Sequence, residues 1–282
     1  MTVGRWRTVW GGATCSTRRQ RRITVMTANV FSGRGKRFPA DFHAAVARHK
    51  PDVLLVQEAV QSHNVPGYEC SYECGDDHNW MAAFVRLTSP WSATKHTTFE
   101  SASCTTTRNA AVLHVASHGG SPLRIANVHL CGGRFDERYH TDDSAADLEH
   151  AKNELLRQVL AEAKPVIVAG DFNSDMNHYV TGEPRAAQAT YLKMRGWSDE
   201  HIAIWNQTPY ALLAANAYAA TSTDAATTSW YGGTPDAIWY HTPALTLRSQ
   251  RLVPLFDRRT DTRPTAGGSD HNGLVATFDV QW

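Results

Sequence analysis

The pattern of apolar residues predicts four strands that each end close to a polar side chain. The strand-like runs cover residues 22–30, 51–60, 122–130 and 165–173. Short apolar runs bounded by turn-forming residues are typical of strands that are buried on both faces of a sheet. The polar residues at their ends are Asn29, Glu58, His129, Asp171 and Asn173. Because sites in open α/β sheets gather at the carboxyl ends of strands, we expect these side chains to lie at one edge.

Two later runs have the opposite order, with the polar residues in front of the strand. Asp236 precedes the apolar stretch 237–240, and Asp270 and His271 precede the stretch 273–280. A strand that runs antiparallel to its neighbour begins at the edge where that neighbour ends. We therefore expect these three residues to join the first group.

Helices are predicted between the strands. Residues 40–49 form one helix, and residues 143–163 place leucine and valine on one stripe, which is typical of a surface helix that covers a sheet. A third helix is expected over residues 190–198. Residues 205–235 show no steady period and predict a long loop region, with a short helix near 211–218 at most. Long connections of this kind often shape a binding site.

The composition is that of an ordinary globular protein. A chain of 282 residues with 42% hydrophobic content is long enough for a single α/β domain. No run approaches the about 20 apolar residues that a membrane-spanning helix needs. The five cysteines are few and odd in number, which favours a reducing compartment over a disulfide framework. We therefore expect a soluble intracellular protein.

The net charge of +1 conceals a basic N-terminal segment. Residues 1–22 contain six arginines and no acidic residue, which leaves 22 basic against 27 acidic residues in 23–282, a net charge of −5. We interpret residues 1–22 as a flexible arm. Its arginines could form a nuclear localisation signal or contact a phosphate backbone, or the arm could simply be solvated.

Six motifs follow one another along the predicted strand edges: "TANV", "VQEAV", "NVHL", "AGDFNS", "TPDAIWY" and "GGSDHNGL". As an ordered set they resemble the endonuclease/exonuclease/phosphatase superfamily, which has a DNase I-like fold. The resemblance spans residues 23–282 and implies a single catalytic domain after the arm. The implied fold is α/β, a four-layer α/β sandwich in which two packed mixed β-sheets are flanked by helices.

The resemblance also implies a Mg²⁺-dependent or Mn²⁺-dependent phosphodiesterase. Glu58 would be the principal metal ligand, with Asn29 and Asp270 beside it. Carboxylate and amide oxygens of this kind suit hard cations.

Around the phosphate, Asp171 would orient or deprotonate the attacking water, and Asn173 would hold the phosphate. His271 would contact the phosphate, and Asp236 would fix the tautomer of His271 and favour its charged form. His129 would contact the phosphate from the other side. The cation and both imidazoles are expected to supply positive charge to the transition state.

Each of these residues alone has an ordinary structural explanation. Asn29 and Asp236 lie where turns are common, and a lone histidine such as His129 is more often a satisfied core residue. Packing gives no reason for Asp270 and His271, two bulky polar residues that follow Gly-Gly-Ser at the start of a strand. A binding protein that had lost the chemistry would show a damaged motif set, whereas every position here holds a competent residue.

The motifs do not choose the substrate. A nuclease acting on DNA or RNA is the first expectation, because nucleic acid is the most frequent substrate of the fold. The basic residues that could support nucleic-acid binding locally are Arg124, Arg134 and Arg138. The alternative is a sphingomyelinase-like or other phospholipid or small-molecule phosphodiesterase. That alternative gains support if the 205–235 region forms an apolar rim from Trp205, Tyr210, Leu212, Leu213 and Tyr218.

Overall fold

The structure is a computed structural model. It describes residues 21–30, 38, 40–59, 64–74, 80–102, 107–117, 120–132, 144–194, 196–222, 228–229, 233–255 and 269–281. The predicted arm lies outside these residues apart from its last two arginines, which belong to the first strand.

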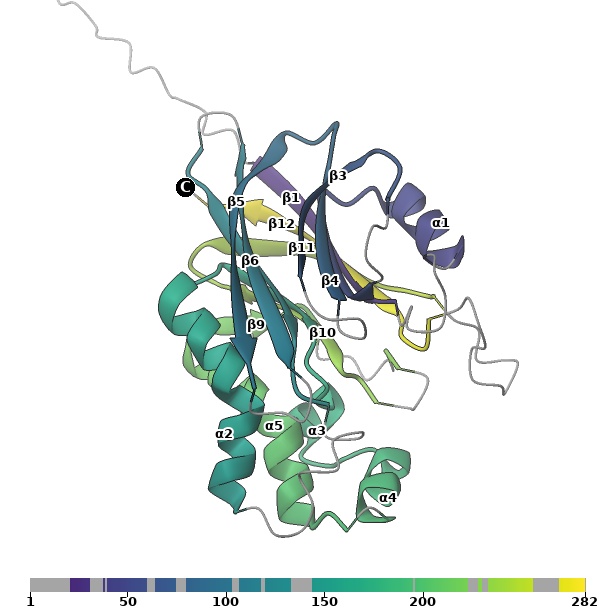
Figure 1. Ribbon diagram of the computed structural model, residues 1–282, viewed down its shortest axis with the longest axis vertical. Coiled ribbons are helices and arrows are strands. Elements are labelled where there is room, and N and C mark those ends of the chain that lie inside the picture. The colour runs from purple at the N-terminus through teal and green to yellow at the C-terminus, as the bar shows by residue number, and fades with distance from the viewer. Residues whose placement is uncertain are drawn as a thin grey trace, which may run out of the picture.

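Twelve strands within the described residues form two six-stranded sheets (Figure 1). The first sheet has the order β11 (Leu245–Val253), β12 (Gly273–Val280), β1 (Arg21–Asn29), β2 (Val53–Ala59), β4 (Trp80–Arg86) and β3 (Tyr68–Cys74). The second has the order β5 (Trp91–Ser101), β6 (Arg108–Ser117), β7 (Leu123–His129), β8 (Ile167–Asp171), β10 (Asp236–His241) and β9 (Tyr218–Ala220). Both sheets contain parallel and antiparallel pairs.

Helices cover the outer faces of the two sheets, as Figure 1 shows. Helix α1 (Ala40–His49) packs on the first sheet through Phe42, and α2 (Ala145–Gln158) and α5 (Asp199–Ala215) pack on the second. A third apolar cluster, which includes Leu55, Leu113 and Ile125, fills the space between the sheets. The arrangement is the predicted four-layer sandwich, so the expected fold class is confirmed.

The helix predictions are partly correct. Helix α1 has the predicted bounds, and α2 begins at Ala145, after its N-cap Ser144, and continues as a π-helical segment over Val159–Ala163. Two further helices, α3 (Met176–Thr181) and α4 (Ala186–Met194), follow β8, and α4 lies a few residues earlier than the helix expected over 190–198.

The prediction of a long loop from residue 205 is wrong for its first part, because α5 runs to Ala215. Pro209 lies inside this helix and cannot donate a hydrogen bond to the carbonyl of Trp205. The Ser174 hydroxyl donates to that carbonyl instead, at 2.9 Å. A tertiary contact therefore replaces the bond that proline removes.

No helix among the described residues has both the length and the apolar character needed to cross a membrane. Cys131, which follows β7 by two residues, is disulfide-bonded, a feature that the cysteine count did not predict.

The strand register brings the predicted residues to one edge. His129 in β7 pairs with Asp171 in the parallel neighbour β8, and Asp171 pairs with Asp236 in the antiparallel neighbour β10. In the other sheet, Asn29 of β1 pairs with Gln57 of β2, one residue before Glu58. The expectation that these side chains share one edge is confirmed.

Gly170 generates a stability prediction. Its φ is +148°, and a Cβ at this position would lie 1.9 Å from the carbonyl oxygen of Val128 in β7. We expect Gly170→Ala to lower the free energy of unfolding by about 3 kcal/mol, because both the backbone conformation and the overpacking are unfavourable. Chemical denaturation measures the loss.

Gly182→Ala is the matched control, since Gly182 also has a positive φ, +76°, but nothing lies within 4 Å of the added Cβ. Its cost should be about 1 kcal/mol, from the backbone conformation alone. Equal losses in the two variants would show that β7 and β8 are not as close as described.

Candidate active site

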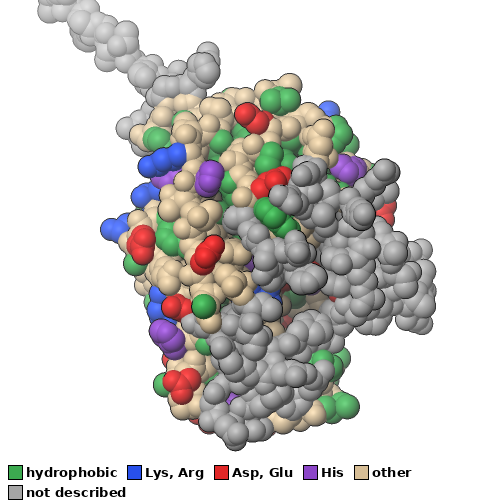
Figure 2. All heavy atoms as spheres, in the orientation of Figure 1, with side chains coloured by type: hydrophobic (Ala, Val, Ile, Leu, Met, Phe, Trp, Pro, Cys, Tyr) green, Lys and Arg blue, Asp and Glu red, His purple; other side chains and the backbone are tan. Residues whose placement is uncertain are grey.

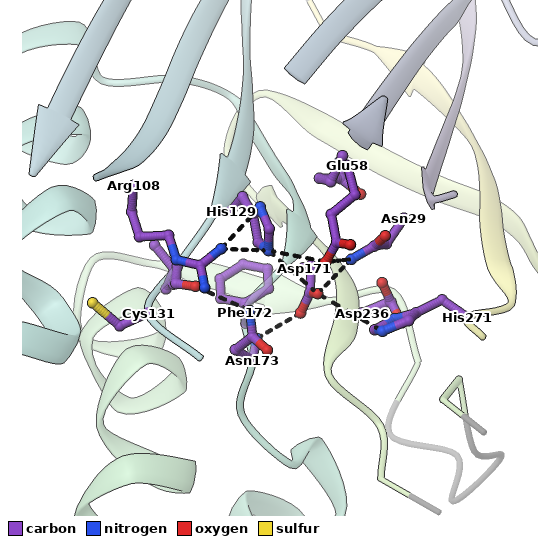
Figure 3. A network of polar contacts seen from close by, with 12 residues as sticks. Asn29, Glu58, Arg108, His129, Cys131, Asp171, Phe172, Asn173, Asp236 and His271 are labelled. Carbon is purple, nitrogen blue, oxygen red and sulfur yellow. Dashed lines mark hydrogen bonds and ion pairs between the residues drawn. The ribbon is translucent and has the colours of Figure 1, made fainter. Parts of the chain in front are cut away.

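The predicted site residues meet in one cavity of about 120 Å³ at the edge where strands of both sheets end. Its lining includes Glu58, His129, Asp171, Asn173, Asp270 and His271. Asn29 and Asp236 make direct hydrogen bonds to members of this group (Figure 3). The structure thus brings all eight predicted residues together.

Asn29 connects the two sheets at the centre of the site. Its Nδ2 donates to Asp171 Oδ2 at 2.8 Å and to Glu58 Oε1 at 3.0 Å, and the side chain is fully buried. The Ser269 hydroxyl donates to the carbonyl oxygen of Asn29 at 2.7 Å. Asn29 therefore fixes two carboxylates and the segment that precedes β12.

Glu58 reaches the cavity because the backbone of β2 is irregular there. Its φ is +51°, and the register between β2 and β4 shifts between Val56 and Ala59. A bulge of this kind redirects a side chain next to a functional site. Burial raises the pKa of Glu58 to about 7, although the Asn29 hydrogen bond and His271 oppose the shift.

Asp171 is a buried carboxylate at the end of β8 that contacts the other sheet through Asn29. Burial acts to raise its pKa, but His271, His129 and the hydrogen bonds from Asn29 and Asn173 outweigh it, so the pKa is lowered. Asp171 is therefore ionised at neutral pH.

Asn173 lies two residues beyond Asp171 in a left-handed conformation, with φ +50°. Its backbone N–H donates to Asp171 Oδ1 at 2.7 Å, and its Nδ2 donates to the carbonyl of Leu130 at 3.0 Å. The turn after β8 thus places a carboxylate and an amide side by side in the cavity.

His271 and Asp236 form a buried pair, with 2.8 Å between Nδ1 and Oδ2. Burial alone would lower the pKa of His271, but Asp236, Asp171 and Asp270 together raise it well above its ordinary value. Burial raises the pKa of Asp236 to about 6. Near pH 7 the pair is an imidazolium facing a carboxylate.

His129 differs from the expectation that both imidazoles are charged. It is 1% exposed, and Arg108 Nη1 lies 3.1 Å from its Nε2. Burial and the Arg108 guanidinium lower the pKa of His129 to about 3. The positive charge on this side of the cavity therefore belongs to Arg108, and His129 is neutral.

The donor set suits a divalent cation. Ligand atoms of Glu58, His129 and Asp171 lie within 4.8 Å of one another, and so do those of Asp171, Asp236 and His271. The loss of hydration at Glu58 outweighs the hydrogen bond from Asn29 and raises its pKa, so a cation beside this carboxylate would favour its ionised form. Carboxylate oxygens that converge in this way fit a hard cation.

Several residues near the site have roles that the sequence did not indicate. Gln57 Nε2 donates to Asn127 Oδ1 at 2.5 Å, and this fully buried pair joins β2 to β7 below the cavity. Lys152 is buried behind the turn after β8. From the sequence, Arg108 is either a solvated residue or a substrate contact, because no motif marks the beginning of β6.

The Endonuclease/Exonuclease/phosphatase family model matches residues 26–271. No curated protein matches the chain.

Solved structures with a similar fold cover almost the whole chain. TDP2 from D. rerio, complexed with single strand DNA product, has 16% identity and a TM-score of 0.59 over 92% of this chain and 99% of that chain. The catalytic domain of human Nocturnin, with a bound sulfate anion, has 19% identity and a TM-score of 0.57 over 92% and 94%.

An endonuclease/exonuclease/phosphatase from Beutenbergia cavernae has 17% identity and a TM-score of 0.59 over 93% of this chain and 72% of that chain. At these identities the likeness concerns the fold. Because the family model covers most of the sequence and the fold agrees with it, the chain belongs to the Endonuclease/Exonuclease/phosphatase family.

Proposed function

We propose that the protein is a divalent-metal-dependent phosphodiesterase that cleaves DNA or RNA. The observation that carries the proposal is the convergence of Glu58, Asp171 and the His271–Asp236 pair in one cavity. Members of the family are hydrolases of phosphoester bonds. An anionic phosphate needs positive charge around it, and an attacking water needs a carboxylate that orients it.

Asp171 is the candidate for orienting the water. It is ionised, and Asn29 and the backbone of Asn173 hold both of its oxygens. A carboxylate with a lowered pKa is a weak base, so it accepts a hydrogen bond from water and aims the lone pair of the water oxygen. Asn173, held by the carbonyl of Leu130, would contact a phosphate oxygen.

His271 and Arg108 are the candidates for binding the phosphate. The imidazolium of His271 is fixed by Asp236 through Nδ1, which leaves Nε2 to donate a hydrogen bond. Arg108 adds a planar guanidinium on the opposite side, beside His129. Both donors hold their charge before the substrate binds, which favours a transition state with more negative charge.

Glu58, Asn29 and Asp270 would hold a metal ion, with Asp171 close to them. When bound, Mg²⁺ or Mn²⁺ supplies a Lewis acid that stabilises negative charge on phosphate oxygens. The carboxylate groups fit this role because Glu58, Asp171 and Asp270 line the same cavity, and ligand atoms of Glu58 and Asp171 lie within 4.8 Å of each other.

The fold favours nucleic acid over phospholipid as the substrate. Of the residues expected to form an apolar rim, Tyr210, Leu213 and Tyr218 are buried in the core and Leu212 is partly buried, whereas Trp205 is buried and lines the cavity. On the described part of the face in Figure 2, acidic, basic and apolar side chains are interspersed. TDP2 and Nocturnin, which share the fold, were solved with single-stranded DNA and sulfate respectively. Arg134 and Arg138 lie outside the described residues.

A substrate panel tests the proposal. The protein is incubated with plasmid DNA, single-stranded DNA, RNA and sphingomyelin vesicles, each with Mg²⁺ and with a chelator. We expect Mg²⁺-dependent cleavage of a nucleic acid, and a loss of kcat by about 1,000-fold in Asp171→Asn, because the isosteric amide lacks the negative charge that orients the water.

Asp199→Asn provides the matched control, since it changes an exposed carboxylate on α5 with a 78% exposed side chain. Its kcat should equal that of the unmodified protein. Cleavage of sphingomyelin alone would exclude the nuclease, and full activity of Asp171→Asn would exclude the proposed site.

Metal binding predicts a pH-dependent stabilisation. Mg²⁺ should raise the midpoint of thermal unfolding more at pH 8 than at pH 6, because Glu58, with a pKa of about 7, is protonated below that pH and Mg²⁺ must then displace the proton. Differential scanning fluorimetry with and without Mg²⁺ measures the shift. Glu58→Gln should remove it, whereas Glu69→Gln on the exposed surface of β3 should keep it. A Mg²⁺ shift that survives in Glu58→Gln would place the metal elsewhere.

Arg108 generates a kinetic prediction. Arg108→Met should lower kcat/KM by about 100-fold, because it removes a fixed cation from the phosphate site. The same change should raise the pKa of His129, since the guanidinium lowers it. Steady-state kinetics and NMR titration of the histidines measure the two effects. Unchanged values of both would show that Arg108 does not face the cavity.

A further inference from the structure

Lys152 is a buried cation that the proposed reaction does not use directly. It lies on α2 and is 1% exposed. Its Nζ donates to the carbonyl oxygens of Cys131 at 2.7 Å, Phe172 at 2.7 Å and Asn173 at 3.1 Å. The indole ring of Trp205 covers the ammonium, with 4.2 Å between Nζ and the ring centroid.

These contacts require the protonated form of the amine. Three carbonyl acceptors need three N–H donors, which only the ammonium has. Burial lowers the pKa of Lys152 well below its ordinary value, and Asp171 opposes that shift. Among the described residues Lys152 forms no salt bridge, so backbone carbonyls and an aromatic face are its local partners. Burial of a charge in this way is unfavourable for stability. Stability therefore does not explain why a lysine occupies this position, and a role at the site would.

The three carbonyls belong to the two segments that carry catalytic groups. Cys131 follows His129 by two residues at the end of β7, and Phe172 lies between Asp171 and Asn173 at the end of β8. One ammonium therefore bridges both strand ends from behind the cavity.

A single peptide group links Lys152 to Asp171. The carbonyl of Phe172 accepts from Lys152, and the N–H of the same peptide, on Asn173, donates to Asp171 Oδ1 at 2.7 Å. A cation at the oxygen end of a peptide dipole and a carboxylate at its N–H end strengthen each other's hydrogen bonds. Hydrogen bonds thus run from the Lys152 ammonium through the Phe172–Asn173 peptide to the Asp171 carboxylate. They hold Asp171 in one orientation and Asn173 in its left-handed conformation.

We propose that Lys152 is a positioning residue whose ammonium clamps the ends of β7 and β8 and, through the Phe172–Asn173 peptide, fixes Asp171 and Asn173 for the reaction. The kinetic part of its test rests on the function proposed above. Lys152 itself touches neither the substrate nor the attacking water.

The kinetic test compares Lys152→Met and Lys152→Arg with Leu155→Met, a volume-conserving change of a buried residue on the same helix. In Lys152→Met we expect kcat to fall by about 100-fold with KM within about threefold, because a small displacement of a positioned group is costly for the reaction and not for binding. Lys152→Arg keeps the charge and the N–H donors, so its kcat should be at least tenfold higher than that of Lys152→Met. Leu155→Met should keep full activity.

A second measurement does not depend on activity. Native-state hydrogen exchange, followed by NMR, should show that the amide of Asn173 loses at least tenfold of its protection in Lys152→Met, while the amide of Ala169 within β8 is unchanged. If the protein cleaves none of the substrates, the proposed function fails, and this exchange experiment still decides on Lys152.

Unchanged protection of the Asn173 amide in folded Lys152→Met would overturn the proposal, and so would unchanged kcat. Equal losses of kcat in Lys152→Met and Leu155→Met would also overturn it, because the effect would then come from α2 as a whole. If Lys152→Met does not fold, Lys152→Gln, which keeps a polar side chain without the charge, takes its place in both measurements with the same expected results.

Discussion

The hydrogen bond from Asn29 Nδ2 to Asp171 Oδ2, at 2.8 Å, is the contact on which the site depends. It joins the end of β1 in one sheet to the end of β8 in the other, so it forms only when the two sheets pack in one register. The buried pair of Gln57 and Asn127 supports that register one layer below. Asn127 also donates to the carbonyls of Val56 and Ala82, so its amide group is bonded on both sides. Buried polar groups that are fully bonded specify one packing arrangement more strongly than apolar contacts do.

The same packing gathers charges that would be unfavourable in an ordinary core. The acids around the cavity are Glu58, Asp171, Asp236 and Asp270, and the cations are Arg108, Lys152 and His271. Each cation has a separate position: Arg108 lies beside His129, His271 faces Asp236, and Lys152 is behind the turn after β8. Burial raises the pKa of Glu58 to about 7 and that of Asp236 to about 6, but Asp236 is paired with His271, so Glu58 is the carboxylate whose ionised form a bound cation would favour. The fold therefore accepts a cost in stability at the point where the proposed chemistry needs a polar, preorganised environment.

Sequence reasoning located the ends of the central strands because buried strands have a plain signature and polar residues interrupt it. The run that ends at Asp171 and the one that begins at Asp236 were correctly predicted to share an edge, and the antiparallel pairing of β8 and β10 is the reason. The sequence pattern does not predict β3, β4, β5, β6, β9 or β11. Strand β5 exposes most of its side chains and therefore forms no apolar run, whereas β4 and β6 are mostly buried but carry none of the six motifs.

The remaining misses have tertiary causes. Helix α5 contains Pro209, and a proline in the sequence argues against a helix. The structure explains the exception, because the Ser174 hydroxyl donates to the Trp205 carbonyl, which has lost its usual backbone donor. In the sequence, Lys152 is one of several charged residues on an amphipathic helix. Its neighbours in the sequence do not show that it donates to the carbonyls of Cys131 and Phe172. The neutrality of His129 depends on burial and on Arg108, and both arise only when distant parts of the sequence meet in the folded sheet.

The central claim is that amide, carboxylate and imidazole groups from two sheets form one site around a divalent ion. Anomalous diffraction from a crystal soaked in Mn²⁺ tests it most directly, because the signal locates the ion without reference to activity. We expect one strong peak within coordination distance of the Glu58 carboxylate, on the side that faces Asp171 and Asp270. A peak bound elsewhere on the chain, with none beside Glu58, would contradict it.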